Sequence, residues 1–191
     1  VLGGVGFIGR NFVKYLVDNN LAAKIRVVDK VLPAIAFLGQ AHQDAFNNPI
    51  VEFMQGNLTS ADSVAKVFTL PEGQFNLVFN LAAETKYGQT DAVYAEKVLD
   101  LSVKVATEAV KRKVDKFIEV STAQVYEAGK KKAKEGDKTD PWTGIAKYEL
   151  KAEEELRKIG GLNLIIVRPA TVYGPGDING LSPRIICGAV Y

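Results

Sequence analysis

Cysteine and histidine, which carry much of protein chemistry, are nearly absent from this chain of 191 residues: Cys187 and His42 are the only examples. A single cysteine excludes a disulfide within the chain and any zinc site built from several thiolates. A single histidine disfavours both a histidine-rich metal site and a Ser/His/Asp triad. We therefore expect no metal site, and any catalysis must depend on Tyr, Thr, Lys or carboxylate side chains.

Excess charge of one sign and long apolar runs are also missing. Lys and Arg total 24 against 22 for Asp and Glu, so the formal net charge is only +2. This balance argues against strong electrostatic binding to nucleic acid or to a membrane surface. No apolar run reaches the roughly 18 residues that span a bilayer, and no targeting signal is visible. We therefore expect a cytoplasmic protein with neither nucleic-acid nor membrane partners.

Short apolar runs alternate with segments of helical periodicity. Runs typical of buried strands cover 24–29, 50–54, 77–83, 117–120 and 162–167. Segments with apolar residues three and four apart, typical of helices, cover 7–19, 92–112 and 144–159. The alternation predicts an α/β fold, with a parallel sheet and helices on both of its faces.

The most informative motif is the glycine-rich segment Gly3-Gly4-Val5-Gly6-Phe7-Ile8-Gly9, at the end of a strand and the start of a helix. It fits Gly-x-Gly-x-x-Gly from Gly4 and Gly-x-x-Gly-x-x-Gly from Gly3. Glycine allows a tight turn, lets the main chain approach a pyrophosphate and lets the helix pack close to the strand. The helix N-terminus then offers free N–H groups and the positive end of its dipole to the phosphates.

An acidic residue follows at the spacing typical of dinucleotide-binding folds. Asp29 ends the next predicted strand, 20 residues after Gly9. A carboxylate there accepts hydrogen bonds from ribose hydroxyls and repels a 2′-phosphate, which favours NAD over NADP, although Lys30 would weaken that repulsion. No Gly-Lys-Ser/Thr occurs, so a nucleoside-triphosphate P-loop is excluded. The alternative is a glycine turn with an unrelated aspartate.

Further segments match one family in order along nearly the whole chain. They are Gly3 to Gly9, Gln55-Gly56-Asn57-Leu58, Asn80-Leu81-Ala82-Ala83, Lys97-Val98, Val120 to Tyr126 and Arg168 to Asp177. With them the chain resembles the extended short-chain dehydrogenase/reductases of the NAD-dependent epimerase/dehydratase group. The resemblance implies that NAD is bound by Gly3, Gly6, Phe7, Ile8, Gly9, Asp29, Asn57, Leu58, Leu81, Ala82, Ala83 and Lys97. Departures from the family pattern are Leu2 for Thr, Asn57 for Asp, Lys97 for Asn and Thr171 for Asn.

The resemblance also carries expectations about fold and activity. It implies one Rossmann-type NAD-binding domain over residues 1–191, a doubly wound parallel sheet, with the family's C-terminal substrate domain largely missing. Because the chain starts at Val1 as if within a strand and ends in an apolar segment, we interpret it as a fragment. The implied activity is hydride transfer between the nicotinamide and a hydroxyl-bearing substrate, a sugar nucleotide. The family often dimerises through two long helices, here 92–112 and 144–159, so a homodimer is expected.

The family's catalytic groups are a Ser or Thr hydroxyl and a Tyr with a Lys four residues later. Thr122 fits the hydroxyl role, and its alternative is to cap backbone at the strand end. We assign the other two roles to Tyr148 and Lys151, which are three residues apart and therefore lie on roughly one helical face.

Other readings of this helix stay open. If Ala152, Glu153 and Leu156 are aligned to the family's helix, Ile145 and Glu149 fall on the Tyr and Lys positions. Lys147 could instead face the cofactor with Tyr148 turned away, or these residues could simply be solvated.

Two other functions compete with an enzyme of this family. The irregular Tyr/Lys spacing favours a non-catalytic NAD-binding sensor or scaffold of the same fold. A methyltransferase using S-adenosylmethionine shares the glycine loop and the acidic strand end, but it gives no role to Thr122 or to residues 168–177.

Four isolated residues complete the predictions. We expect His42 at the surface and Cys187 packed within a terminal apolar helix. Tyr126 and Tyr173 are expected in core packing or in the wall of a substrate cleft.

Overall fold

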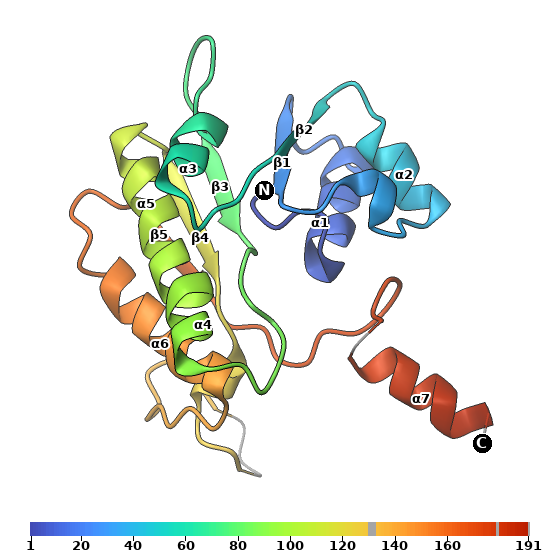
Figure 1. The fold of residues 1–191 in the computed structure, drawn as a ribbon, viewed down its shortest axis with the longest axis vertical. Helices are drawn as coiled ribbons and strands as arrows, with labels where there is room; N and C mark the ends of the chain where they lie inside the picture. Colours follow the sequence, from blue (N-terminus) through green and yellow to red (C-terminus); the bar gives the residue numbers. More distant parts are fainter. Residues whose placement is uncertain (130–132, 179, 191) are drawn as a thin grey trace. The chain divides into compact units, whose positions relative to one another are not determined.

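The computed structural model describes residues 1–129, 133–178 and 180–190. They form two compact units (Figure 1). Unit 1 comprises Val1–Gln55 and Thr171–Tyr191, and unit 2 comprises Gly56–Ala170.

Unit 1 is built on a pair of parallel strands. Its elements are α1 (Phe7–Asp18), β1 (Ile25–Asp29), η1 (Pro33–Ile35), α2 (Gln40–Phe46), β2 (Val51–Gln55) and α7 (Leu181–Val190). Strands β1 and β2 pair in parallel, with Val27 opposite Phe53. The segment before α1 also runs beside β1, through a parallel bridge between Leu2 and Val28, as its strand-like sequence predicts. The buried core of this unit includes Val5 and Val13, so the first turn and helix α1 are fixed against the strands.

Unit 2 is a three-stranded parallel sheet with helices packed beside it. Its elements are α3 (Ala61–Val67), β3 (Leu77–Asn80), α4 (Asp91–Tyr94), the π-helical turn η2 (Ala95–Asp100), α5 (Leu101–Lys111), β4 (Lys116–Val120), η3 (Ala123–Val125), α6 (Gly144–Leu156) and β5 (Leu164–Val167). The strand order is β3-β4-β5, and both pairings are parallel. Helix α5 packs between α3 and α6 (Figure 1). Phe117 of β4 and Leu156 of α6 are fully enclosed in this core.

The predicted elements are confirmed, with two differences in detail. The segment predicted as one helix over 92–112 consists of α4, the wider turn η2 and α5. Strand β5 was expected to be buried on both faces, but Ile165 and Val167 are 40% and 44% exposed. β5 is an edge strand of the described β3-β4-β5 sheet, so its alternate side chains are less covered than those of β4.

Two predictions about single residues are wrong. His42 is buried, at 8% exposure, because α2 packs on α1 and the imidazole finds a hydrogen-bond partner there. Cys187 is exposed, because α7 buries none of its described side chains. Across the described residues, none of the helices combines the length and the apolar character needed to cross a membrane.

Candidate functional site

The glycine turn ahead of α1 has no room for a side chain at Gly4 or at Gly9. A Cβ on Gly9 would lie 2.4 Å from the carbonyl oxygen of Gly3, and one on Gly4 would lie 2.5 Å from a methyl group of Val27. Gly3 itself has a φ of 71°, in the left-handed region that glycine adopts without cost. The fold therefore requires these glycines.

The N-terminus of α1 is uncapped. Its N-cap is Gly6, which offers no side-chain acceptor, and its first turn holds no acidic residue. The N–H groups of the first turn, Phe7 to Gly9, have no partner within the helix. Free amides at the positive end of a 12-residue helix make a binding position for an anion such as a phosphate.

Asp29, at the carboxyl end of β1, ties the glycine turn to the loop that follows the strand. Its Oδ2 accepts a hydrogen bond from the Val5 N–H at 3.1 Å, and its Oδ1 accepts one from the Val31 N–H at 3.1 Å. Each carboxylate oxygen can accept a further hydrogen bond. Asp29 can thus shape the turn and still receive the hydroxyls of a ribose.

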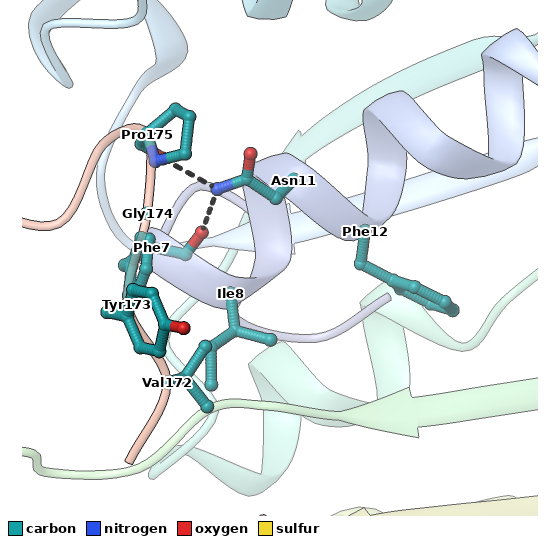
Figure 2. A pocket seen from close by; sticks show the side chains of 8 residues that line it. All are labelled: Phe7, Ile8, Asn11, Phe12, Val172, Tyr173, Gly174 and Pro175. Carbon is teal, nitrogen blue, oxygen red and sulfur yellow. Dashed lines mark hydrogen bonds between the residues drawn. The ribbon is translucent and has the colours of Figure 1, made fainter.

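An apolar pocket of about 290 Å³ lies beside the same helix (Figure 2). It is lined by Phe7, Ile8, Asn11, Phe12, Val172, Tyr173, Gly174 and Pro175. The amide of Asn11 donates to the carbonyl oxygens of Phe7 and Pro175, both at 2.9 Å. Tyr173 lines this pocket. The pocket shares Phe7 and Ile8 with the uncapped first turn of α1.

The remaining predicted cofactor residues lie in unit 2. The side chain of Asn57 accepts hydrogen bonds from the backbone and hydroxyl of Thr59, and Leu58 is buried. Leu81, Ala82 and Ala83 follow β3, where Asn80 Oδ1 accepts a hydrogen bond from the Ala82 N–H at 3.2 Å. Lys97 of η2 lies 3.9 Å from the carboxylate of Glu84.

Thr122, the predicted catalytic hydroxyl, occupies the position of a cap. Its Oγ1 accepts a hydrogen bond from the Gln124 N–H at 3.2 Å, at the start of η3. Thr143, the N-cap of α6, donates to Gln124 Oε1 at 2.9 Å, so the Thr122 segment is joined to the start of α6. Thr122 therefore does cap the backbone, which was the alternative to a catalytic role. Because its oxygen only accepts in this contact, the hydroxyl proton remains available for donation.

Tyr148 is buried rather than solvated, so the solvated alternative is wrong for this residue. It forms a core cluster with Tyr94 and Val98, against which Ala83 packs, and its ring stacks on that of Tyr94 at 6.0 Å between centroids. The ammonium of Lys151 lies 4.5 Å from the centre of the Tyr148 ring. The spacing of three thus brings the predicted pair together, with the ammonium over the face of the ring.

The side chain of Lys147 is paired with an acidic residue. Its Nζ lies 3.7 Å from a carboxylate oxygen of Asp91, and its side chain is half exposed.

Sequence reasoning missed a group of buried glutamates in unit 2. Glu119 of β4 accepts hydrogen bonds from Asn80 at 2.9 Å and from Ser102 at 2.7 Å. Burial raises its pKa to about 7, against the opposing effect of these two hydrogen bonds. The sequence did contain a sign of this buried carboxyl group, because Glu119 is the single acidic residue within the apolar run 117–120.

Glu153 of α6 is fully enclosed but well paired. It accepts hydrogen bonds from the Ser121 hydroxyl at 2.7 Å and from Arg168 Nε at 2.9 Å. Burial pushes its pKa upward, but the hydrogen bonds from Arg168 and Ser121 outweigh burial and lower the pKa. Arg168 also donates to the Tyr126 hydroxyl at 2.7 Å, which places Tyr126 in this packed network rather than in a described cleft.

Glu149, one turn before Glu153, has no such partners. Its Oε2 is buried and makes no hydrogen bond among the described residues. Burial, together with the charges of Glu119 and Glu153, raises the pKa of Glu149 well above its ordinary value. A raised carboxyl pKa means that the folded state keeps a proton which the unfolded state releases above about pH 4.5. Stability is therefore lost as the pH rises from that value through the folded-state pKa.

Gly9→Ala tests the turn. The added methyl meets backbone atoms at 2.4 Å, so we expect a fall of several degrees in the midpoint of thermal unfolding, measured by circular dichroism. Gly188→Ala is the matched control, because a Cβ there meets nothing within 4 Å and alanine favours the helix. Equal midpoints for Gly9→Ala and the parent chain would refute the steric account.

Glu149→Gln tests the buried proton. Burial raises the pKa of Glu149 well above its ordinary value, so this carboxyl makes stability fall by at most about 1.4 kcal/mol per pH unit as the pH rises from about 4.5 through the folded-state pKa. We expect urea unfolding to show a smaller fall in stability with rising pH for Glu149→Gln than for the parent chain. The exposed Glu154→Gln, on the same helix, should keep the parent slope. Parallel profiles for all three proteins would contradict the assignment.

Comparisons with known proteins agree with this geometry. The Low-salt glycan biosynthesis protein Agl12 of Haloferax volcanii is 26% identical over 185 residues, covering 92% of this chain and 56% of that protein. The structure of DesIV, a dTDP-glucose 4,6-dehydratase from Streptomyces venezuelae with NAD bound, has 22% identity and a TM-score of 0.84, over 99% of this chain and 61% of that one. The UDP-glucuronic acid 4-epimerase of Bacillus cereus, solved with NAD, has 22% identity and a TM-score of 0.77, over 92% of this chain and 57% of that one.

These matches confirm the predicted Rossmann-type fold. The chain spans a little more than half the length of the proteins it matches. The profile of the NAD dependent epimerase/dehydratase family matches residues 1–190, and it confirms the predicted resemblance and NAD as the family's cofactor. The chain therefore belongs to the NAD-dependent epimerase/dehydratase family.

Proposed function

We propose that the protein uses NAD to act as an epimerase, dehydratase or dehydrogenase on a hydroxyl group of a sugar nucleotide. The observation that carries this proposal is the tight glycine turn before the uncapped N-terminus of α1, with Asp29 beside it. That cradle fits a dinucleotide, because the N-cap Gly6 makes no side-chain hydrogen bond to the first amides of the helix.

Three parts of the cofactor have a matching place in unit 1. The amides of Phe7 to Gly9 would hold the pyrophosphate, and Asp29 would accept hydrogen bonds from the adenosine ribose. The apolar pocket beside α1 suits the nicotinamide ring, since Phe7 and Ile8 belong both to the pocket and to the first turn of the helix. When bound, NAD supplies a hydride acceptor, and the protein's part is to orient it and keep water away.

Sugar-linked substrates are proposed from the relatives. Agl12 is named for glycan biosynthesis, and the two enzymes of known structure act on dTDP-glucose and on UDP-glucuronic acid, as their names state. A shared family supports the same class of substrate here, while the particular sugar and the choice among the three reactions are left to experiment.

For the chemistry we propose Thr122, Tyr148 and Lys151. The Thr122 hydroxyl would donate to the reacting oxygen, and Tyr148 would move the substrate proton. The ammonium of Lys151, 4.5 Å from the centre of the Tyr148 ring, would bind the hydroxyls of the nicotinamide ribose.

A second candidate function is a non-catalytic NAD-binding protein of the same family. It is favoured by the burial of Tyr148 in its cluster with Tyr94 and by the capping role of Thr122.

Asp29→Asn tests the cofactor cradle. Loss of the charge removes a charge-assisted hydrogen bond to ribose, so we expect the dissociation constant for NAD to rise about tenfold in calorimetry. NADP should then bind almost as well as NAD, because the repulsion of a 2′-phosphate is gone. Asp44→Asn, an exposed carboxylate on α2, should change neither constant. An unchanged preference for NAD in Asp29→Asn would rule out this role for Asp29.

Thr122→Ala and Tyr148→Phe separate the two candidate functions. For an enzyme, we expect each to lower turnover on a panel of sugar nucleotides by about a hundredfold or more while NAD affinity is retained. Tyr15→Phe, an exposed tyrosine on α1, is the control. If the parent protein binds NAD but neither converts any sugar nucleotide of the panel nor reduces NAD with it, the binding protein is the better account.

A further inference from the structure

His42 has no place in the proposed chemistry, yet it is held in a specific arrangement. It lies on α2, is 8% exposed, and its Nε2 is 3.0 Å from Oδ1 of Asn11 on α1. Burial lowers its pKa, as do the positive charges of Arg10 and Lys14, so the ring is neutral at physiological pH. A neutral imidazole donates from one nitrogen only, and its contact with Asn11 decides which one.

The hydrogen bonds of the Asn11 side chain fix which end of its amide group faces His42. The Nδ2 of Asn11 donates to the carbonyl oxygens of Phe7 and Pro175, both at 2.9 Å (Figure 2). The atom facing His42 is therefore the oxygen, Oδ1. Nε2 of His42 must therefore carry the proton and donate it to Asn11. A chain of two hydrogen bonds runs from His42 through Asn11 to Pro175.

This chain ends in the wall of the apolar pocket. One side of the pocket is α1, and the other is the segment 172–175, which includes the exposed Tyr173. The hydrogen bond from Asn11 to Pro175 joins the two sides. The amide of Asn11 therefore links the two sides of the pocket, and His42 holds the oxygen of the same amide.

We propose that His42 is a positioning residue that, through Asn11, holds the segment 172–175 against α1 at the spacing that the nicotinamide end of the cofactor requires. The inference rests on the proposed function, in which this pocket receives the nicotinamide. Without a donor at position 42, the Oδ1 of Asn11 loses its partner on α2, and the amide is held only through the two hydrogen bonds of Nδ2. The amide is then less firmly fixed, and so is the segment that it holds through Pro175.

The test compares two ligands on two variants of His42. NAD reaches the pocket, whereas ADP-ribose has the same pyrophosphate and adenosine but lacks the nicotinamide ring. We expect His42→Leu, which fills the space without a donor, to weaken NAD binding about tenfold and ADP-ribose binding less than twofold. His42→Gln, whose amide can donate to Asn11, should restore most of the NAD affinity.

Three results would overturn the inference. The first is an equal loss for both ligands, which a merely structural role of His42 would produce. The second is unchanged NAD affinity in His42→Leu, and the third is a Gln variant that behaves like the Leu variant.

If His42→Leu does not fold, Asn11→Asp replaces the donor to Pro175 with an acceptor and should give the same selective loss of NAD affinity. Failure of the parent protein to bind NAD would instead remove the proposed function itself.

Discussion

The close approach of Gly9 to the carbonyl of Gly3 is the constraint on which unit 1 depends. Because the helix begins so near the strand end, its first amides follow a tight glycine turn that makes no side-chain cap. Asp29 reinforces this arrangement by accepting a hydrogen bond from Val5 within the turn. One set of backbone contacts thus serves the packing of α1 and leaves its positive end uncapped, which is the end that favours an anion.

Unit 2 differs from unit 1, because its core contains buried carboxyl groups at positions where apolar side chains would give a more stable fold. Glu119 and Glu153 are fully satisfied, whereas Glu149 has a buried oxygen without a partner among the described residues. Such a group costs free energy, and proteins keep costly groups mainly where function requires them. Glu149 shares α6 with Tyr148 and Lys151, and one register of the family helix puts it at the Lys position. This helix is where the chain departs most from the chemistry expected of its family.

The sequence predicted the elements and the tight glycine turn well because both follow from local rules. Glycine spacing, a strand-end aspartate and alternating periodicities need no knowledge of distant contacts. It failed where tertiary packing decides: His42 looked polar and exposed, but α1 supplies Asn11 to receive it. It failed again for the glutamates of α6, whose Lys/Glu-rich sequence suits a solvated face although Glu149 and Glu153 face the interior. Tyr148 and Lys151 are three residues apart instead of the family's four, which predicted that their arrangement would differ from that of the family. It did not predict that the Tyr148 ring would be buried.

The central claim is that free main-chain amides at the start of α1 bind the diphosphate of NAD. The most direct measurement is amide NMR of the labelled protein during titration with NAD, read at the N–H groups of Phe7, Ile8 and Gly9. The account predicts that these three signals shift most and become protected from hydrogen exchange as the cofactor saturates. Saturation with NAD that leaves them unshifted and exchanging at their original rates would contradict it.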